Sequence, residues 1–356
     1  MNSTHGGDIT GYELIYGRKP IDFSASLNPL GMPTAVKAAA IQAVEEACHY
    51  PDPYGRALTA ALGEKLEINP AHLILGNGAA DLIHRYVQAL RPRKALLPVP
   101  SFAEYERALA AVGCEVFHHF LRDEGEFDLG EEILGEITGE IDLIFLCQPG
   151  NPTGRLIPIP LLDQILERCT QTGTRVFLDE CFLSFVDCGQ ALSMGSRLEE
   201  YPNLFLLGSF TKRYAMAGLR LGYGLCADAG LMADLALNGQ PWGVSTVAQA
   251  AGLAALGQED YVKESMALIG VQRVWLRDGL CAMGAKVLGG AANYLFFFLP
   301  DGDMKDKLAR QGYLIRSCAN FPGLGPGYYR IAVRTAEENQ GLLRAMGEAL
   351  NGGNRI

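Results

Sequence analysis

The stretch with the clearest chemical potential is GSFTKRYAMAGLRLGYG, residues 208–224, in which a lysine closely follows two hydroxyl side chains. Lys212 stands among small and apolar residues just after an apolar run, where partial burial would disfavour the charged ammonium and leave a nucleophilic amine. Ser209 and Thr211 precede it, and Arg220 follows. A single lysine is more often an ordinary surface residue, so its interpretation depends on the residues that accompany it.

Three other stretches place small or polar residues directly after apolar runs. LILGNGAADLI has Gly78 at a predicted strand-to-helix turn, where backbone N–H groups can bind an anion. FLCQPGNPTG carries Asn151, and FLDECFLSF ends its apolar run on Asp179. Each motif alone is explained as well by a rigid turn or by a solvated carboxylate. Their shared position at strand ends is what links them to Lys212.

These residues need a sheet to position them. Five apolar runs, rich in β-branched or large aliphatic residues, suit strands buried on both faces: 72–75, 95–99, 141–147, 174–178 and 203–207. Helical patterns lie between several of them, at 79–90, 102–112 and 159–172. This alternation predicts a doubly wound α/β domain with a mostly parallel sheet, whose ligands lie at the carboxyl ends of the strands.

The two ends of the chain have a different pattern. The first 33 residues are predicted to be irregular, with a short extended piece at 21–24, and a helix follows from Thr34, as N-cap, to about Cys48. Beyond residue 240 come a long helical stretch at 244–283 and a set of shorter elements, namely strands at 285–288, 293–299, 313–316 and 328–333 and a helix from 335. We therefore predict a large domain at 46–245, a smaller α+β domain at 246–356, and an N-terminal segment, 1–45, that packs on the smaller domain.

Composition excludes several classes of function. The 356 residues are 49% hydrophobic and carry a net charge of -10, which argues against nucleic acid or an anionic membrane as partner. No apolar run is long enough to span a bilayer, and the N-terminus lacks the pattern of a secretory signal. Nine cysteines without a CxxC pair indicate no metal site and favour a reducing cytoplasm.

The strand-end motifs, taken together and in this order, resemble those of the fold-type I pyridoxal-phosphate (PLP) enzymes, the aspartate aminotransferase superfamily. Asn151 precedes Asp179 by 28 residues, and Lys212 follows after 33 more. NPTG, the strand-end DE, and S-x-T-K followed by G-L-R-x-G-Y together make the resemblance specific, and it covers nearly the whole chain. It implies a large doubly wound domain with a smaller α+β domain, and PLP as cofactor.

The resemblance also implies a role for each motif. Lys212 would carry the cofactor as a Schiff base, Asp179 would pair with the pyridine nitrogen, and Asn151 would hydrogen-bond the cofactor's O3′. Phe102 matches an aromatic that stacks on the cofactor ring, although it reads equally well as a core residue. Tyr54 matches a residue that reaches the cofactor phosphate of the neighbouring subunit, which implies a homodimer. The cofactor phosphate would be held by Gly78, Ala79, Ala80, Ser209, Thr211 and Arg220.

Both termini carry residues that the same resemblance assigns to the substrate. Arg330 matches the arginine that binds the α-carboxylate, and Arg316 matches a second cation of members that take phosphorylated substrates. For Arg334 the sequence does not favour a functional role over a structural one. The N-terminal HGGD, followed by DFSASLNPLG, resembles the threonine-phosphate decarboxylase branch, in which an additional anion site is expected. The N-terminal residues of that site would be His5, Gly6, Gly7 and Asn28.

The branch implies decarboxylation of L-threonine O-3-phosphate to (R)-1-amino-2-propanol O-2-phosphate in cobalamin biosynthesis, with a small phosphorylated amino acid as substrate. The alternative is transamination of the histidinol-phosphate type with 2-oxoglutarate and glutamate. Phe182 departs from the D-E-x-Y pattern of many aminotransferases, which weakens that alternative without excluding it. A catalytically silent member is a third possibility. The sequence does not separate threonine phosphate from serine phosphate, which differ by one methyl group.

Overall fold

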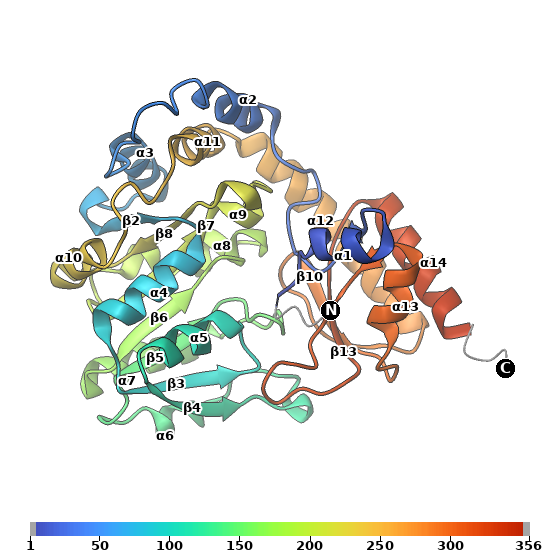
Figure 1. The fold of residues 1–356 in the computed structure, drawn as a ribbon. Helices are drawn as coiled ribbons and strands as arrows, with labels where there is room; N and C mark the ends of the chain where they lie inside the picture. The colour runs from blue at the N-terminus through green and yellow to red at the C-terminus, as the bar shows by residue number, and fades with distance from the viewer. Residues whose placement is uncertain (1–4, 352–356) are drawn as a thin grey trace.

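The computed structural model describes residues 5–351. Its main feature is a seven-stranded sheet of order β2-β8-β7-β6-β5-β3-β4, with helices on both faces (Figure 1). The pairs within β7-β6-β5-β3-β4 are parallel, whereas β8 runs antiparallel to both β2 and β7. The strands are β2 (Leu73–Gly76), β3 (Lys94–Val99), β4 (Glu115–Phe120), β5 (Leu143–Cys147), β6 (Arg175–Asp179), β7 (Leu204–Ser209) and β8 (Gly222–Leu225).

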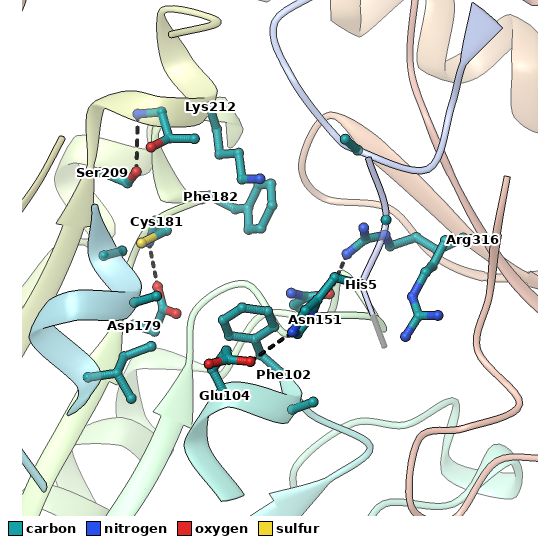
Figure 2. A pocket seen from close by; sticks show the side chains of 18 of the residues that line it. His5, Phe102, Glu104, Asn151, Asp179, Cys181, Phe182, Ser209, Lys212 and Arg316 are labelled. Atoms are coloured by element: carbon teal, nitrogen blue, oxygen red, sulfur yellow. Dashed lines mark hydrogen bonds and ion pairs between the residues drawn. The ribbon is translucent and has the colours of Figure 1, made fainter. Parts of the chain in front are cut away.

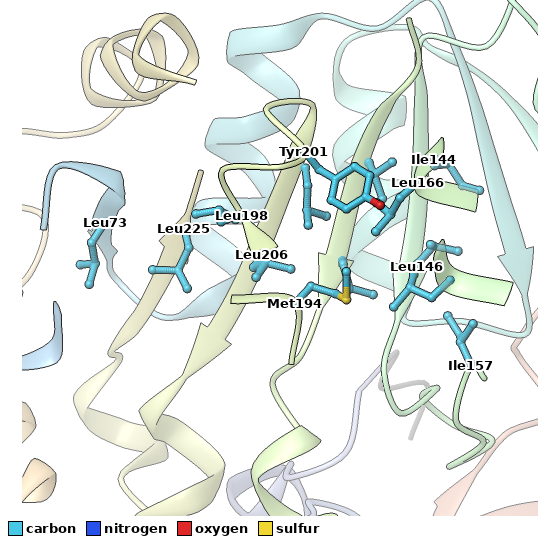
Figure 3. Packing of buried hydrophobic residues seen from close by; sticks show 14 of the residues in the cluster. Leu73, Ile144, Leu146, Ile157, Leu166, Met194, Leu198, Tyr201, Leu206 and Leu225 are labelled. Carbon is cyan, nitrogen blue, oxygen red and sulfur yellow. The ribbon is translucent and has the colours of Figure 1, made fainter. Parts of the chain in front are cut away.

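The central strands are apolar on both sides because each face of the sheet is covered. Leu178 and Leu206 belong to one buried cluster, whose packing Figure 3 shows. Phe177 and Phe205, one position earlier on the same strands, belong to a cluster on the other face, with ring centroids 5.1 Å apart. Because successive side chains of a strand point to opposite faces, each central strand contributes to both hydrophobic clusters.

Helices complete these two layers. The face containing Phe177 is covered by α4 (Ala79–Leu90), α5 (Ala103–Ala111) and α10 (Ala229–Leu237). The face containing Leu178 is covered by α2 (Thr34–Ala43), α3 (Arg56–Leu66), α7 (Ile159–Thr172) and α11 (Thr246–Leu256). The short helices are α6 (Ile133–Glu136), α8 (Gly189–Leu192) and α9 (Phe210–Arg213). The prediction of a doubly wound, mostly parallel α/β fold is therefore confirmed.

Beside the large sheet lies a four-stranded antiparallel sheet of order β12-β13-β10-β9. Its strands are β9 (Lys286–Gly289), β10 (Tyr294–Phe298), β12 (Arg316–Ser317) and β13 (Tyr328–Ala332). The helices that belong to this part are α12 (Glu259–Ala282), α13 (Met304–Gln311) and α14 (Ala336–Asn351). No helix among residues 5–351 is long and apolar enough to cross a membrane.

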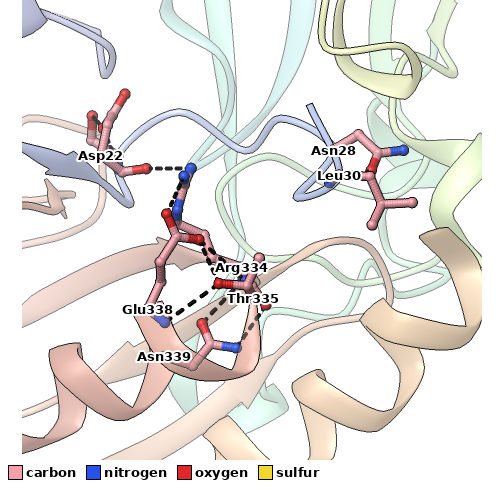
Figure 4. A network of polar contacts seen from close by, with 8 residues as sticks. Asp22, Asn28, Leu30, Arg334, Thr335, Glu338 and Asn339 are labelled. Carbon is pink, nitrogen blue, oxygen red and sulfur yellow. Dashed lines mark hydrogen bonds and ion pairs between the residues drawn. The ribbon is translucent and has the colours of Figure 1, made fainter. Parts of the chain in front are cut away.

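The N-terminal segment lies against this smaller part. Strand β1 (Ile21–Asp22) pairs in parallel with β11 (Tyr313–Leu314), and helix α1 (Ile9–Tyr16) precedes it. Figure 4 shows how Arg334 secures the contact: its Nη1 donates to the Asp22 carbonyl oxygen at 3.1 Å and its Nη2 to Glu338 Oε1 at 2.7 Å. Arg334 is thus engaged in structural contacts. The division of the chain at residues 45 and 245 stays a prediction.

Several sequence-based boundaries were wrong. Residues 9–16 are helical rather than irregular, because Asp8 caps α1 through the Gly11 N–H and Tyr12 anchors the helix to a distant carbonyl oxygen. Pro33, not Thr34, occupies the cap position of α2, which ends at Ala43 instead of Cys48. The stretch 244–283 forms two helices, α11 and α12, with a break after Leu256.

Candidate active site

A cavity of about 480 Å³ opens where the carboxyl ends of the large sheet face the smaller sheet and the N-terminal segment (Figure 2). It brings together most of the residues selected from the sequence, although they come from separate parts of the chain. Those that line it are His5, Gly6, Ala79, Ala80, Phe102, Asn151, Asp179, Ser209, Thr211, Lys212, Arg220, Arg316 and Arg330.

Lys212 lies on α9, the short helix that starts where β7 ends. Burial lowers the pKa of its amine to about 8, and the positive charges of Arg330 and Arg220 act in the same direction. Its Nζ lies 5.8 Å from the centroid of the Phe182 ring. The amine therefore faces an apolar and cationic environment, in which the neutral, nucleophilic form is accessible near neutral pH.

Asp179 is the last residue of β6 and is buried. The Tyr105 hydroxyl donates to its Oδ2 at 2.6 Å, and the Cys181 backbone N–H donates to its Oδ1 at 2.8 Å. Burial raises the pKa of Asp179 above its ordinary value, while the two donors and Lys212 oppose that change. A carboxylate fixed in this way is suited to pair with a protonated ring nitrogen, which would remove the cost of its desolvation.

An anion cradle is formed where α4 begins. Gly78 has a φ of 81°, and a Cβ at this position would overlap the guanidinium of Arg220, so only glycine lets the two approach. The first N–H groups of α4 lack partners within the helix, and Ser209 and Thr211 place hydroxyls in the same cavity. This combination of helix N-terminus, hydroxyls and arginine fits a phosphate group, which is the fit that PLP requires.

Two arginines of the smaller sheet face the cavity because they are cross-strand neighbours. Arg316 on β12 pairs in register with Arg330 on β13, and both are buried. Arg330 donates through Nη1 to Asn151 Oδ1 and through Nη2 to the Ser24 carbonyl oxygen at 3.0 Å. Its Nε is buried without a hydrogen-bond partner among residues 5–351. A ligand carboxylate could therefore satisfy a donor that the protein leaves open.

Arg316 is held by different contacts. Its Nη2 donates to Asn320 Oδ1 at 2.9 Å, and its guanidinium carbon lies 4.9 Å from the centroid of the Phe321 ring. Burial lowers its pKa, and the charge of Arg330 lowers it further. Arg316 and Arg330 lie close enough for the charge of one to lower the pKa of the other. The part of the cavity that both arginines line therefore favours an anionic ligand.

The N-terminal segment contributes to the same wall. His5 and Gly6 line the main cavity, whereas Gly7 lines a small adjoining hollow that Arg316 also borders. The Gly7 N–H donates to Ser24 Oγ at 2.7 Å, and a Cβ at Gly6 would overlap the Ser24 carbonyl group. These contacts fix the backbone of the segment beside the arginines.

Four predicted residues do not line the main cavity: Gly7, which lines the adjoining hollow, and Gly78, Asn28 and Tyr54. Gly78 lies at the start of α4, where the lack of a side chain leaves room for Arg220. Asn28 lies elsewhere because its amide is already used: Nδ2 donates to the Arg213 carbonyl oxygen at 2.9 Å and Oδ1 accepts from the Leu30 N–H. Tyr54 is 71% exposed and contacts Arg56 instead, with the guanidinium 4.7 Å from its ring centroid. Its predicted role concerns a neighbouring subunit and stays a prediction.

Sequence reasoning missed three residues that shape the site. Tyr105 donates to Asp179, and Ser24 connects the Gly7 N–H with Arg330. Glu104 lines the cavity and pairs with His5. A signal was present for two of them, since Glu104 and Tyr105 lie within three residues of Phe102 in PSFAEY, but nothing local indicates where their side chains point.

Comparison with known proteins agrees with this geometry. Residues 18–346 match the family model of aminotransferase class I and II. The threonine-phosphate decarboxylase of Salmonella typhimurium is 38% identical over 99% of this chain and 98% of its own length. Histidinol-phosphate aminotransferase 1 of Cupriavidus pinatubonensis is 32% identical over 93% of this chain and 88% of its own.

The architecture also has a close counterpart among solved structures. Histidinol-phosphate aminotransferase from Sinorhizobium meliloti, determined in complex with pyridoxal-5'-phosphate, superposes with a TM-score of 0.86. It is 24% identical, and the match covers 97% of this chain and 94% of that one. At that identity the likeness establishes the fold, which is that of a PLP transferase of fold type I.

Proposed function

Because the chain belongs to the aminotransferase class I and II family, we propose that it is a PLP-dependent decarboxylase acting on L-threonine O-3-phosphate. The product would be (R)-1-amino-2-propanol O-2-phosphate, as used in cobalamin biosynthesis. The observation that carries the proposal is a second cationic site, formed by Arg316 and Arg330 and separate from the cradle at Arg220. A substrate that bears both a carboxylate and a phosphate needs such a site besides the one for the cofactor.

Residues that line the cavity would hold the cofactor. The N–H groups of Ala79 and Ala80, together with Arg220, would bind its phosphate group, and Asp179 would hold the proton of the ring nitrogen. When bound, PLP supplies an electron sink for the pair left on the substrate carbon. Lys212 provides the amine that links the cofactor, and with a pKa of about 8 it can take up or release a proton near neutral pH.

The choice of reaction depends on how the substrate is oriented at its α-carbon. Arg330, held by Asn151 and Ser24, fixes the carboxylate, while Arg316 and His5 face the substrate phosphate. Binding both anionic ends sets the rotation about the bond to nitrogen, and this rotation decides which bond at the α-carbon breaks. With PLP bound to supply the electron sink, Arg330 and Arg316 would hold the substrate so that the bond to the carboxylate is the one that breaks, and the carboxylate would leave as carbon dioxide.

The proposal includes a homodimer in a reducing cytoplasm. Tyr54 and Tyr50 are both exposed, and Tyr50 stacks on the partly exposed Trp242 with ring centroids 4.5 Å apart. Exposed aromatics of this kind are enriched at protein interfaces. All nine cysteines are free thiols, which supports a reducing compartment.

Release of carbon dioxide tests the proposal directly. The purified holoenzyme is incubated with L-threonine O-3-phosphate, and with L-serine O-phosphate as a second substrate, and carbon dioxide is measured alongside any keto acid. Carbon dioxide without keto acid supports the decarboxylase. Glutamate formed from histidinol phosphate and 2-oxoglutarate would instead support the aminotransferase, which the 32% identity to the Cupriavidus enzyme favours as second candidate. If the wild-type protein took up no PLP, its absorbance would equal that of Lys212→Ala. That result would indicate a catalytically silent member of the family.

A further inference from the structure

One buried carboxylate, that of Glu104, has no role in the reaction above. Glu104 stands in the first turn of α5, is 8% exposed and lines the cavity beside a site that binds anions. Burial alone would raise its pKa, but hydrogen bonds from His84 and His5 outweigh burial, and the pKa lies below its ordinary value. The cavity wall therefore contains a negative charge, which would repel an anionic substrate unless cations compensate it.

The compensating groups come from three separate segments. His5 Nε2 lies 2.7 Å from Glu104 Oε1, and His84 Nε2, on α4, lies 3.2 Å from Oε2. Arg107, one turn further along α5, approaches Oε1 at 3.4 Å. The carboxylate thus joins the N-terminal segment to α5 and to α4, the helix that forms the anion cradle.

His5 is held from a second side by the residue that precedes α5. Its ring lies 5.7 Å from that of Phe102, at an interplanar angle of 53°. Figure 2 shows Glu104 and Phe102 on the same side of His5, with Arg316 beyond it. Further along the segment, Gly7 is fixed independently by Ser24. Removing Glu104 would therefore take away the carboxylate that orients the His5 ring but leave helix α1 attached.

We propose that Glu104 is a positioning residue that fixes the His5 side chain as one wall of the substrate cavity. The position of His5 follows from its contacts with Glu104 and Phe102. Its consequence for the substrate rests on the proposed function: a correctly placed His5 contributes to binding of the substrate phosphate. Glu104 then acts through His5, without touching the reacting atoms.

The kinetic test uses the holoenzyme with Glu104→Ala, Glu104→Gln, His5→Ala and the double variant His5→Ala/Glu104→Ala. Losing a charge-assisted hydrogen bond should raise KM for L-threonine O-3-phosphate about five- to tenfold and leave kcat within about twofold. Glutamine retains one acceptor and should fall between alanine and wild type. Because Glu104 acts through His5, the double variant should equal His5→Ala alone. Additive losses, or an unchanged KM in Glu104→Ala, would overturn the proposal.

Glu106→Gln is the matched control, because Glu106 lies on the same helix and pairs with a different histidine, His118, at 3.3 Å. Its KM should equal that of wild type. Cofactor absorbance should be unchanged in all of these variants, since no variant alters the anion cradle; loss of cofactor in Glu104→Ala would indicate a general structural role instead.

Hydrogen–deuterium exchange separates this inference from the proposed function. In Glu104→Ala the amide of Gly6, next to His5, should exchange about five- to tenfold faster. The amides of Gly7 and of residues 9–16 should not change, because Ser24 holds the Gly7 N–H and Tyr12 anchors α1 through the Ala309 carbonyl oxygen. Faster exchange at Gly6 in a protein that releases no carbon dioxide would retain the positioning role and refute the substrate. Unchanged exchange at Gly6 would refute the positioning role, whatever the activity.

Discussion

Removing the charge of Arg330 should raise the pKa of Lys212 and slow capture of the cofactor near neutral pH. Burial is the largest cause of the lowered pKa of Lys212, and Arg330 is the next. The substitution Arg330→Gln removes the second cause and retains a polar side chain in the same place. Arg330→Lys retains the charge and serves as the control.

The magnitude follows from the fraction of neutral amine, which is the form that attacks the aldehyde of PLP. With a pKa of about 8, roughly a quarter of Lys212 is neutral at about pH 7.5, against roughly 0.1% for an ordinary lysine with a pKa of 10.5. The capture rate of Arg330→Gln should therefore fall, but by less than the roughly 200-fold that a complete return to the ordinary value would produce, because burial remains.

The assay follows PLP uptake by the apoenzyme as a function of pH, without substrate, so that the role of Arg330 in substrate binding does not enter. The amine loses its reactivity as pH falls through its pKa, so the wild-type rate should fall below about pH 8. The midpoint should move upward in Arg330→Gln and stay near that of wild type in Arg330→Lys. A wild-type midpoint near 10.5, or an unmoved midpoint in Arg330→Gln, would refute the electrostatic account.

Three further predictions concern single contacts. Gly78→Ala should weaken PLP binding at least about tenfold in equilibrium titration, because a left-handed φ costs about 1–2 kcal/mol and the new Cβ overlaps Arg220. Asp179→Asn should reduce carbon dioxide release at least about 100-fold while cofactor absorbance persists, because the charge that holds the ring proton is lost. Arg334→Ala should lower the melting temperature by several degrees, since about 1–3 kcal/mol of anchoring to Asp22 is lost, and leave PLP affinity unchanged; reduced PLP affinity would contradict this reading.

The large sheet was predictable where strands are buried on both faces, and β5, β6 and β7 match the apolar runs to within two residues. Strand β4 was missed because it lies at the edge of the sheet, with alternating exposed positions and two histidines. Strand β8 was missed because it is rich in glycine. That composition is a packing requirement: a Cβ at Gly222 would overlap the start of α4, and one at Gly224 would overlap the Phe205 ring.

The residues of the site also differ in how well the sequence predicts them. The residues predicted to hold the cofactor lie at or just after strand ends, so local motifs reveal them. The pairing of Arg316 with Arg330 is a matter of strand register, and the pairing of His5 with Glu104 joins positions 99 residues apart. Contacts of this kind depend on tertiary structure, and a single sequence contains no local signal for them. Asn28 shows the converse, a polar residue near the site whose amide is taken up by the backbone.

The cross-strand arrangement of the two arginines bears on the choice of substrate. Side chains directly opposite on antiparallel strands start about 4.5–5.5 Å apart, so Arg316 and Arg330 present their charges to neighbouring points in the cavity. In L-threonine O-3-phosphate the carboxylate and the phosphate-bearing oxygen lie on adjacent carbons, and both anions can be bound by such a pair. Histidinol phosphate carries only the phosphate, so the α-carboxylate that the alternative reaction would place at Arg330 comes from glutamate, bound in a separate half-reaction. Under the proposed function one substrate would bring both anions to the arginine pair, and the fixed position of Arg330 would give it one orientation at its α-carbon.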